Sequence, residues 1–207
     1  MSPLSRGRAL TLGAAFLIAA LAACGSDPFA VTARLDVLED TLTVHAINDE
    51  SAAPELPVAL DISTQRFGTL GELIREPRAE PISNAYDFDV AFDVRGDTAI
   101  LLTPRRVASP FGFTRRVGVL APTATFEALT RAPGSGYLFD TVAVKLREGG
   151  TAVVVSAHPD CASEVHQELY AKVGILDVDP VAKTVTFRVR LDPNCGFRSF
   201  LPGVPRS

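Results

Sequence analysis

The chain has 207 residues, with 20 basic and 24 acidic side chains and a formal net charge of −4 at pH 7. This acidic balance argues against general affinity for nucleic acid or for anionic lipid surfaces. The length suits one sizeable domain that can bury a core without help from a metal or a partner.

The N-terminal segment predicts export. Arg6 and Arg8 give a positive start without any acidic residue, and an uncharged apolar stretch follows over residues 9–23. Such a stretch can insert as a helix but is short for a stable membrane span, which favours a signal peptide over an anchor helix. We expect residues 1–23 to be a signal peptide, 24–29 a short tether and 30–207 a single domain.

The end of this segment, Leu21-Ala22-Ala23-Cys24, resembles the lipobox of bacterial lipoproteins. The resemblance covers roughly the first two dozen residues. It implies cleavage before Cys24 and lipid on its thiol, with acyl chains such as palmitate that hold the protein durably to a membrane. Because no aspartate follows the cysteine directly, the resemblance favours the outer membrane, facing the periplasm or the surface. The alternative is an ordinary secretory signal with a chance cysteine.

After this segment the dominant pattern is alternation of apolar and polar residues, broken at intervals of about ten residues by Gly, Pro, Asn and Asp clusters. This pattern predicts about nine or ten short antiparallel strands and almost no helix. The predicted strands are residues 31–37, 42–46, 58–62, 86–94, 99–102, 115–120, 137–146, 151–157, 169–178 and 183–191. The Gly- and Pro-containing residues 66–81 predict a long loop, 161–168 a short helix or a loop, and 194–207 an irregular tail.

Three turns connect these strands. Residues 39–40 are expected to turn the chain between the first two strands, 148–150 to close a hairpin in the middle of a sheet, and Asp179-Pro180 to close the final hairpin. The fold class is therefore an antiparallel β-sandwich. A closed or partly open β-barrel is the alternative, because both architectures use the same alternation.

The strand over residues 86–94 has the cleanest alternation. Its apolar residues are expected to share the core face, and these are Phe88, Val90, Phe92 and Val94. Its carboxylates are expected on the other face, and these are Asp87, Asp89 and Asp93. A solvated outer face and a calcium site, which uses oxygen ligands, are the two interpretations of these carboxylates.

The two remaining cysteines, Cys161 and Cys195, form an even pair in a compartment where disulfides persist, so we predict that they are bonded. On the chain-entropy model, closing a loop of this length stabilises the fold by about 4 kcal/mol.

The tightest cluster of reactive side chains lies near the first of these cysteines. His158, Asp160 and His166 all offer ligand atoms that zinc accepts. Their spacing matches neither a paired-cysteine site nor the two-histidine helix of zinc hydrolases, so the prediction is no metal, with these three residues as the weak alternative. No cofactor is expected.

One loop is the best candidate for a contact site. Two aromatic rings lie between two pairs of guanidinium groups, in an arrangement that suits an anionic ligand, a glycan or a lipid surface. The residues are Arg105, Arg106, Phe111, Phe113, Arg115 and Arg116. The alternative is that the rings fold into the core and the arginines are solvated.

The patterns that activate a serine or cysteine nucleophile are not found in the sequence, nor are the glycine loops that cradle phosphates. We therefore expect no enzyme and no nucleotide or nucleic-acid partner. The favoured function is a membrane-anchored envelope module that binds a protein, a glycan or a small ligand. A structural or assembly accessory of the envelope is the alternative, and a metal-dependent enzyme is third.

Overall fold

The structure is a computed structural model that describes residues 32–50, 53–67, 73–82, 87–107, 115–139, 143–162 and 164–205, with backbone only at 64–67, 73, 74 and 160. By internal contacts the chain divides into residues 1–32 and 33–207, and all elements below belong to the second unit. The predicted signal peptide, Cys24 and the tether lie outside the described residues. Within the described ranges, no helix is long and apolar enough to cross a membrane.

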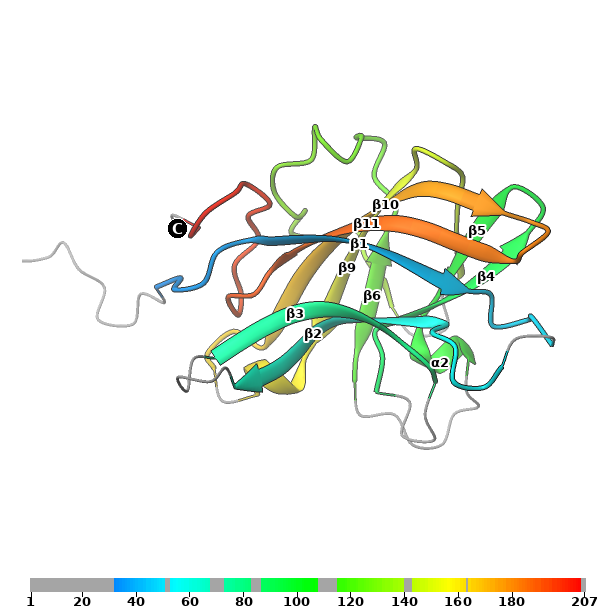
Figure 1. Cartoon of the computed structure of the whole chain (residues 1–207). Coiled ribbons are helices and arrows are strands. Elements are labelled where there is room, and N and C mark those ends of the chain that lie inside the picture. Colours follow the sequence, from blue (N-terminus) through cyan, green and yellow to red (C-terminus); the bar gives the residue numbers. More distant parts are fainter. Residues whose placement is uncertain are drawn as a thin grey trace, which may run out of the picture. The chain divides into compact units, whose positions relative to one another are not determined.

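In the described part of the chain, eleven strands form two antiparallel sheets that are not closed into a barrel (Figure 1). The prediction of an antiparallel β-sandwich is therefore confirmed. At one side of the sandwich, the edge strand of one sheet, β1 (Leu38–His45), lies alongside an edge strand of the other, β3 (Leu73–Glu80).

Both sheets mix strands from distant parts of the chain. From edge to edge, the six-stranded sheet contains β1, β11 (Thr184–Asp192), β10 (Glu168–Asp179), β9 (Thr151–Ala157), β6 (Val117–Leu120) and β7 (Leu138–Phe139). The five-stranded sheet, in the same sense, contains β3, β2 (Ala59–Phe67), β4 (Val90–Arg95), β5 (Thr98–Leu102) and β8 (Ala143–Leu146). Two short helical turns connect strands, α2 (Pro104–Val107) after β5 and a 3-10 turn (Pro159–Cys161) after β9.

The core lies between the two sheets. Its centre is a stacked pair of rings, Phe92 on β4 and Phe187 on β11, whose centroids are 4.6 Å apart. Alternate residues of β11 are fully buried, as the period of two requires, and these are Val185, Phe187, Val189 and Leu191. Burial of each such side chain stabilises the fold by about 1.5–3 kcal/mol.

The final hairpin and the disulfide are both as predicted. Strands β10 and β11 pair in antiparallel register around the turn at residues 180–183. Cys161 and Cys195 form a disulfide, with their Cα atoms 5.7 Å apart. The bond joins the turn after β9 to the segment after β11, so it closes the open end of the last hairpin.

Two predicted turns are wrong. Residues 39 and 40 lie inside β1, which is one continuous strand because each of its residues pairs with β11. The turn at residues 148–150 does not close a hairpin, because β8 pairs with β5 whereas β9 pairs with β10 and β6. Gly149 adopts a φ of 76° there, and the turn carries the chain from one sheet to the other.

Strand β3 replaces part of the predicted loop over residues 66–81. Pro77 lies inside it, at an edge of the five-stranded sheet where proline is tolerated. Opposite Pro77 the register of β2 shifts between Asp61 and Thr64, which is a β-bulge. The bulge places Ile62 and Ser63 opposite the single residue Pro77, so their backbone N–H groups are left for acceptors outside the pairing of β2 with β3.

The predicted face assignment around β4 is partly wrong. Val90, Phe92 and Val94 face the core as expected, but Phe88 packs in a second cluster with Ala59 and Ala91. Of the three carboxylates expected on a solvated face, Asp87 is exposed, whereas Asp89 is 0% and Asp93 5% exposed.

A loop between β6 and β7 covers part of the outer face of the six-stranded sheet. Lys172 on β10 is fully buried under it, and its ammonium donates to the backbone carbonyls of Phe126 and, at 2.9 Å, Leu129. The ammonium also lies 4.1 Å from the centroid of the Phe126 ring. The buried cation therefore fixes this loop to the sheet.

Candidate ligand-binding site

A concave site lies next to this loop, on the outer face of the six-stranded sheet, and we call it the aromatic groove. It has a volume of about 330 Å³. The lining residues are Arg116, Gly134, Ser135, Gly136, Tyr137, Phe139, Val155, Ala157, Glu168 and Tyr170.

The floor of the aromatic groove is a row of residues that pair across four neighbouring strands. Tyr170 on β10 lies opposite Val155 on β9, Val155 opposite Gly118 on β6, and Gly118 opposite Phe139 on β7. Gly118 is required at this position, because a Cβ atom would lie 2.6 Å from Cε1 of Phe139. The ring of Phe139 therefore lies directly over the backbone of β6.

Three aromatic rings surround this floor. The Tyr137 ring is tilted against the rings of Phe139 and Tyr170, with both pairs of centroids 6.4 Å apart. The Tyr137 hydroxyl donates to the carbonyl of Pro133 at 2.9 Å, which holds the ring in place. Burial raises the pKa of both tyrosines above the ordinary value, so both remain neutral at physiological pH.

One wall of the aromatic groove is the turn over residues 134–136. Gly134 packs against the guanidinium of Arg198, since a Cβ atom there would lie 2.6 Å from Nη1. Gly136 adopts a φ of 91°, which favours glycine. All three residues of the turn are exposed and line the groove.

Two opposite charges flank the aromatic groove. The backbone of Arg116 accepts a hydrogen bond from Ala157 N, and Glu168 pairs with Ala157 from the other side, so the order across the sheet is Glu168, Ala157, Arg116. Both charged side chains are exposed. The Arg116 guanidinium lies 4.1 Å from the centroid of the Phe139 ring, a cation–π contact that orients it.

A second group of polar side chains lies between the two sheets, and we call it the charge cluster. It contains Asp61, Asp89, Arg115 and His158. Nη1 of Arg115 lies 3.3 Å from Oδ1 of both Asp61 and Asp89, and Nε2 of His158 lies 3.1 Å from Oδ1 of Asp61. All four residues are at most 9% exposed.

The bulge in β2 builds this cluster. The N–H of Ile62 donates to Oδ2 of Asp89 at 2.8 Å, and the N–H of Ser63 donates to Oδ1 of Asp61 at 3.1 Å. These are the backbone groups opposite Pro77, so the irregular strand supplies the donors that two buried carboxylates need. Asp61 belongs to the five-stranded sheet, whereas Arg115 and His158 adjoin strands of the six-stranded sheet, so the cluster joins the two layers.

The pKa values in the cluster follow from this geometry. Burial alone would raise the pKa of Asp61, but the hydrogen bond from His158 and the charge of Arg115 lower it below its ordinary value. Burial raises the pKa of Asp89 although Arg115 opposes the shift. Glu80, at the end of β3, has its pKa raised to about 7 by burial and by the charge of Asp61.

The charge cluster contains residue types that can bind a metal ion. Asp61, Asp89 and His158 each offer one ligand atom, and these atoms lie within 4.8 Å of one another. The Arg115 guanidinium, however, already contacts both carboxylates and supplies the positive charge that a metal would bring. A cation therefore already lies between the two carboxylates, and a metal ion would have to displace Arg115.

The structure does not bring together the two histidines that the sequence analysis named as possible metal ligands. His158 is turned inward to Asp61, whereas His166 is exposed and its Cγ lies 2.7 Å from the position of a Cβ atom at Gly196. The side chain of Asp160 lies outside the described residues. Among the described residues, the structure brings His158 together with Asp61 and Asp89 instead.

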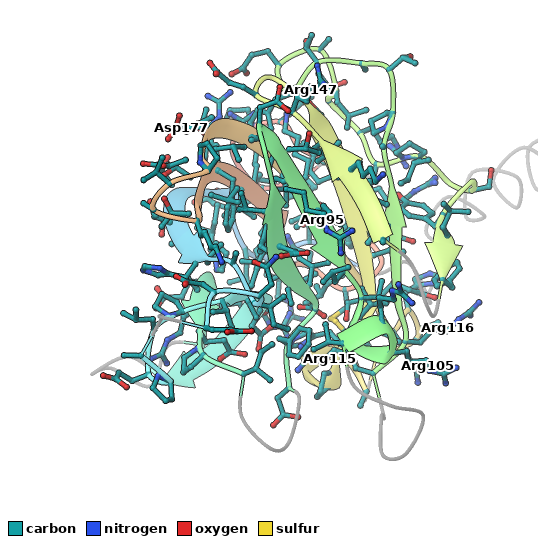
Figure 2. The ribbon with its side chains drawn as sticks, turned by 90° about the vertical axis from the view of Figure 1, so that its right-hand side faces the viewer. Arg95, Arg105, Arg115, Arg116, Arg147 and Asp177 are labelled. Carbon is teal, nitrogen blue, oxygen red and sulfur yellow. A yellow bond between two sulfur atoms is a disulfide. The ribbon has the colours of Figure 1, made fainter. Side chains whose placement is uncertain are left out.

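The residues of the predicted contact loop are separated by the structure. Arg105 and Arg106 are exposed on α2, and Arg116 lines the aromatic groove. Figure 2 labels Arg105, Arg115 and Arg116 on the ribbon. Arg115 is 9% exposed and belongs to the charge cluster, so both the contact-loop prediction and its alternative of solvated arginines are wrong at this position. Phe111 and Phe113 lie outside the described residues.

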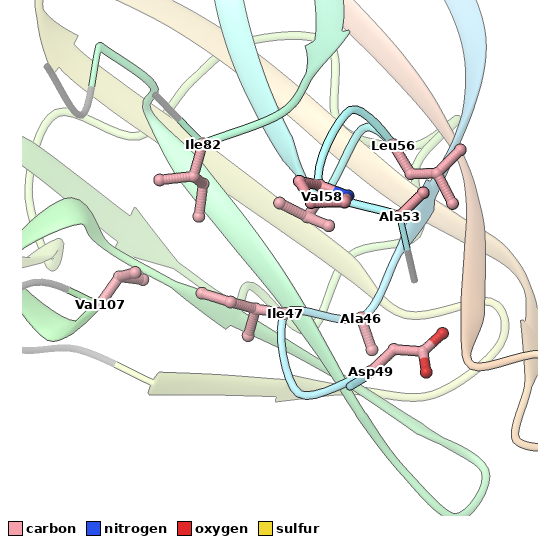
Figure 3. Close-up of a pocket in the computed structure, with 9 residues that line it drawn as sticks. Ala46, Ile47, Asp49, Ala53, Leu56, Val58, Ile82 and Val107 are labelled. Atoms are coloured by element: carbon pink, nitrogen blue, oxygen red, sulfur yellow. The ribbon is translucent and has the colours of Figure 1, made fainter. Parts of the chain in front are cut away.

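A second concave site is apolar. It has a volume of about 390 Å³ and is bordered by Ile47, Val58, Ile82 and Val107, with Asp49 as its charged member (Figure 3). A binding site needs a few convergent polar groups to orient its ligand. The aromatic groove has them on both sides, so it is the stronger candidate.

Sequence reasoning missed the aromatic groove apart from Arg116. One local signal was present in the sequence. Tyr137 and Phe139 are two residues apart, so in an extended chain they face the same side, and Tyr170 lies between the buried Leu169 and Ala171, so it faces away from the core. The spatial order of β7, β6, β9 and β10 brings these rings together, and that order is set by long-range pairing. No model of a known protein family matches this chain, and neither a curated protein nor a solved structure was found to match it.

Proposed function

We propose that this protein is an exported, lipid-anchored binding module of the cell envelope, without catalytic activity, that holds a small polar ligand in the aromatic groove. The observation that carries the proposal is the combination of three half-buried rings with two exposed, opposite charges around one cavity. Apolar surface with a few oriented polar groups is typical of ligand sites.

The geometry of the charge cluster supports a role without catalysis. Its carboxylates are bound to Arg115, His158 and backbone N–H groups, and its members are buried, so this network has a sufficient explanation as a joint between the sheets. The disulfide between Cys161 and Cys195 supports an oxidising compartment, which agrees with the export that the N-terminal segment predicts.

The binding part of the proposal is tested with a blocked groove. Ala157 lines the aromatic groove and is exposed, so Ala157→Phe should fill the cavity without disturbing the core. Ala143, exposed on β8, allows Ala143→Phe as the matched control. A panel of neutral oligosaccharides, amino acids, dicarboxylates and nucleosides is screened by ligand-observed NMR. We expect at least one class to bind the wild-type chain and the control but not Ala157→Phe; if no class does so, the binding proposal is wrong.

The anchor is tested by the intact mass of the full chain purified from bacterial membranes and of Cys24→Ser purified from whole cells, with the membrane fraction assayed for both. We expect the wild-type mass to show loss of residues 1–23 and addition of acyl chains, whereas Cys24→Ser should remain unlipidated and leave the membrane fraction. A wild-type chain without acyl groups would contradict the anchor and leave the binding proposal unaffected.

A further inference from the structure

We propose that the ligand of the aromatic groove is an uncharged saccharide, with one sugar ring seated over Ala157. This inference rests on the proposed binding function and names the ligand class for the same site. It is carried by the spacing of the flanking charges, by the nature of the floor and by the polar groups at the rim.

The spacing of the two charged residues suits a ring-sized ligand. Glu168 and Arg116 flank Ala157 on the two neighbouring strands, so their backbones are two strand spacings apart, or about 10 Å. The methyl group of Ala157 leaves the space between them open. A sugar ring placed there has hydroxyl groups at both ends, within reach of a side chain on each side.

The floor is suited to the apolar face of a sugar ring. The C–H groups on one face of a pyranose form a flat apolar surface, and aromatic or aliphatic side chains provide the matching contact. Val155 and the partly exposed rings of Tyr170 and Phe139 supply such a surface next to Ala157. Gly118 lets the Phe139 ring lie directly over the backbone of β6, so this ring forms part of the floor.

The rim supplies both kinds of hydrogen-bonding partner. The Arg116 guanidinium only donates and the Glu168 carboxylate only accepts, whereas a sugar hydroxyl does both. The exposed turn over residues 134–136 adds backbone groups and the Ser135 hydroxyl. Hydrogen bonds to charged partners are the strong ones, so a polyol can be held from both sides.

Other ligand classes match this arrangement less well. A phosphate or dicarboxylate would meet the repulsion of Glu168 as well as the attraction of Arg116. In a free amino acid the ammonium and carboxylate are attached to one carbon, so the molecule spans less of the space between the flanking residues than a sugar ring with hydroxyl groups at both ends. The exposed, charged rim is also unsuited to an acyl chain, which needs an enclosed apolar cavity.

The test measures binding of chitotriose, maltotriose, trialanine and inorganic phosphate to the full chain with its disulfide intact, by isothermal titration calorimetry. We expect at least one trisaccharide to bind saturably and both other probes to fail. Loss of one charge-assisted hydrogen bond in Glu168→Ala or Arg116→Met should weaken saccharide binding about tenfold. The matched controls Glu148→Ala and Arg147→Met alter exposed charges outside the groove and should stay within about twofold.

The outcomes separate this inference from the proposed function. If trialanine or phosphate binds in a manner that Ala157→Phe abolishes and neither trisaccharide binds, the saccharide inference is wrong while the groove remains a binding site. A trisaccharide that binds equally well to Glu168→Ala and Arg116→Met would also overturn the inference, because its site would lie elsewhere. If no member of the wider panel binds at the groove, both proposals are wrong.

Discussion

Arg115 and Arg116 are adjacent in the sequence but lie in two different regions of the molecule. Arg115 points into the sandwich and completes the charge cluster, whereas Arg116 points outward and flanks the aromatic groove. Alternation along an extended chain separates them onto opposite faces. The cluster uses its charges to satisfy one another in a buried site, while the groove leaves its charges exposed to water. The same residue types therefore contribute to stability in one region and are available for recognition in the other.

The sharpest test of this contrast is the pair Arg115→Met and Arg116→Met. Removal of Arg115 leaves Asp61 and Asp89 buried without their cation, so we expect a loss of about 3–5 kcal/mol in the free energy of unfolding. Arg116 is exposed, so its substitution should cost less than about 1 kcal/mol. Urea denaturation of the full chain measures both values. Equal losses would show that the cluster does not depend on its central cation.

A smaller effect on stability is expected at Gly118, under the Phe139 ring of the aromatic groove. Gly118→Ala places a methyl group against the Phe139 ring, which must shift, so we expect a loss of about 1–2 kcal/mol in unfolding free energy. In the background of Phe139→Ala the same substitution should have almost no cost, because the collision partner is gone. A cost that persists in the double variant would mean that the strain arises elsewhere on β6.

The smallest expected effect is a pH dependence at the edge of the charge cluster. The pKa of Glu80 is raised to about 7, so the folded state binds its proton more tightly than the unfolded state does, and stability falls as pH rises from about 4.5 to 7. Glu80→Gln removes this titration and should make the protein more stable than the wild type at pH 8. Because Glu80 is partly exposed and water screens its charge, the gain should be about 1 kcal/mol.

Thermal or urea unfolding of both chains at pH 5 and pH 8 measures this difference. The groups that face Glu80 are Asp61, Asp89, Arg115 and Arg78, and they are unchanged in the variant. A wild-type chain whose stability rises between these pH values by as much as that of Glu80→Gln would show that Glu80 has an ordinary pKa.

The alternation of apolar and polar residues was sufficient to predict the elements that follow it. The hairpin of β10 and β11 and the β-sandwich class follow from alternation, and the disulfide follows from an even pair of cysteines in a chain whose N-terminal segment predicts export. Strand β3 was missed because it contains Pro77, and proline argues against a strand unless the strand lies at the edge of a sheet. The position of a strand in its sheet depends on long-range pairing and cannot be predicted from a short stretch of sequence.

The buried polar residues were missed for a related reason. Alternation along the strand predicted a solvated face for Asp89, but the bulge in β2 supplies a backbone N–H that donates to its carboxylate and allows its burial. Arg115 was grouped with Arg116 because the two are adjacent in sequence, while their partners lie far apart. The aromatic groove likewise depends on the order β7, β6, β9, β10, which only the completed sheet defines.

The pairing of the first strand with the last one constrains when this domain can be completed. Glu39 on β1 and Arg190 on β11 are ion-paired and lie 151 residues apart in the chain. A chain that is threaded across a membrane from its N-terminus therefore cannot finish the six-stranded sheet until its last segment has emerged. Contacts of such sequence separation form slowly. If the chain is exported as proposed, the domain stays unfolded during passage, whereas the final hairpin and its disulfide can form locally once both cysteines reach the oxidising side.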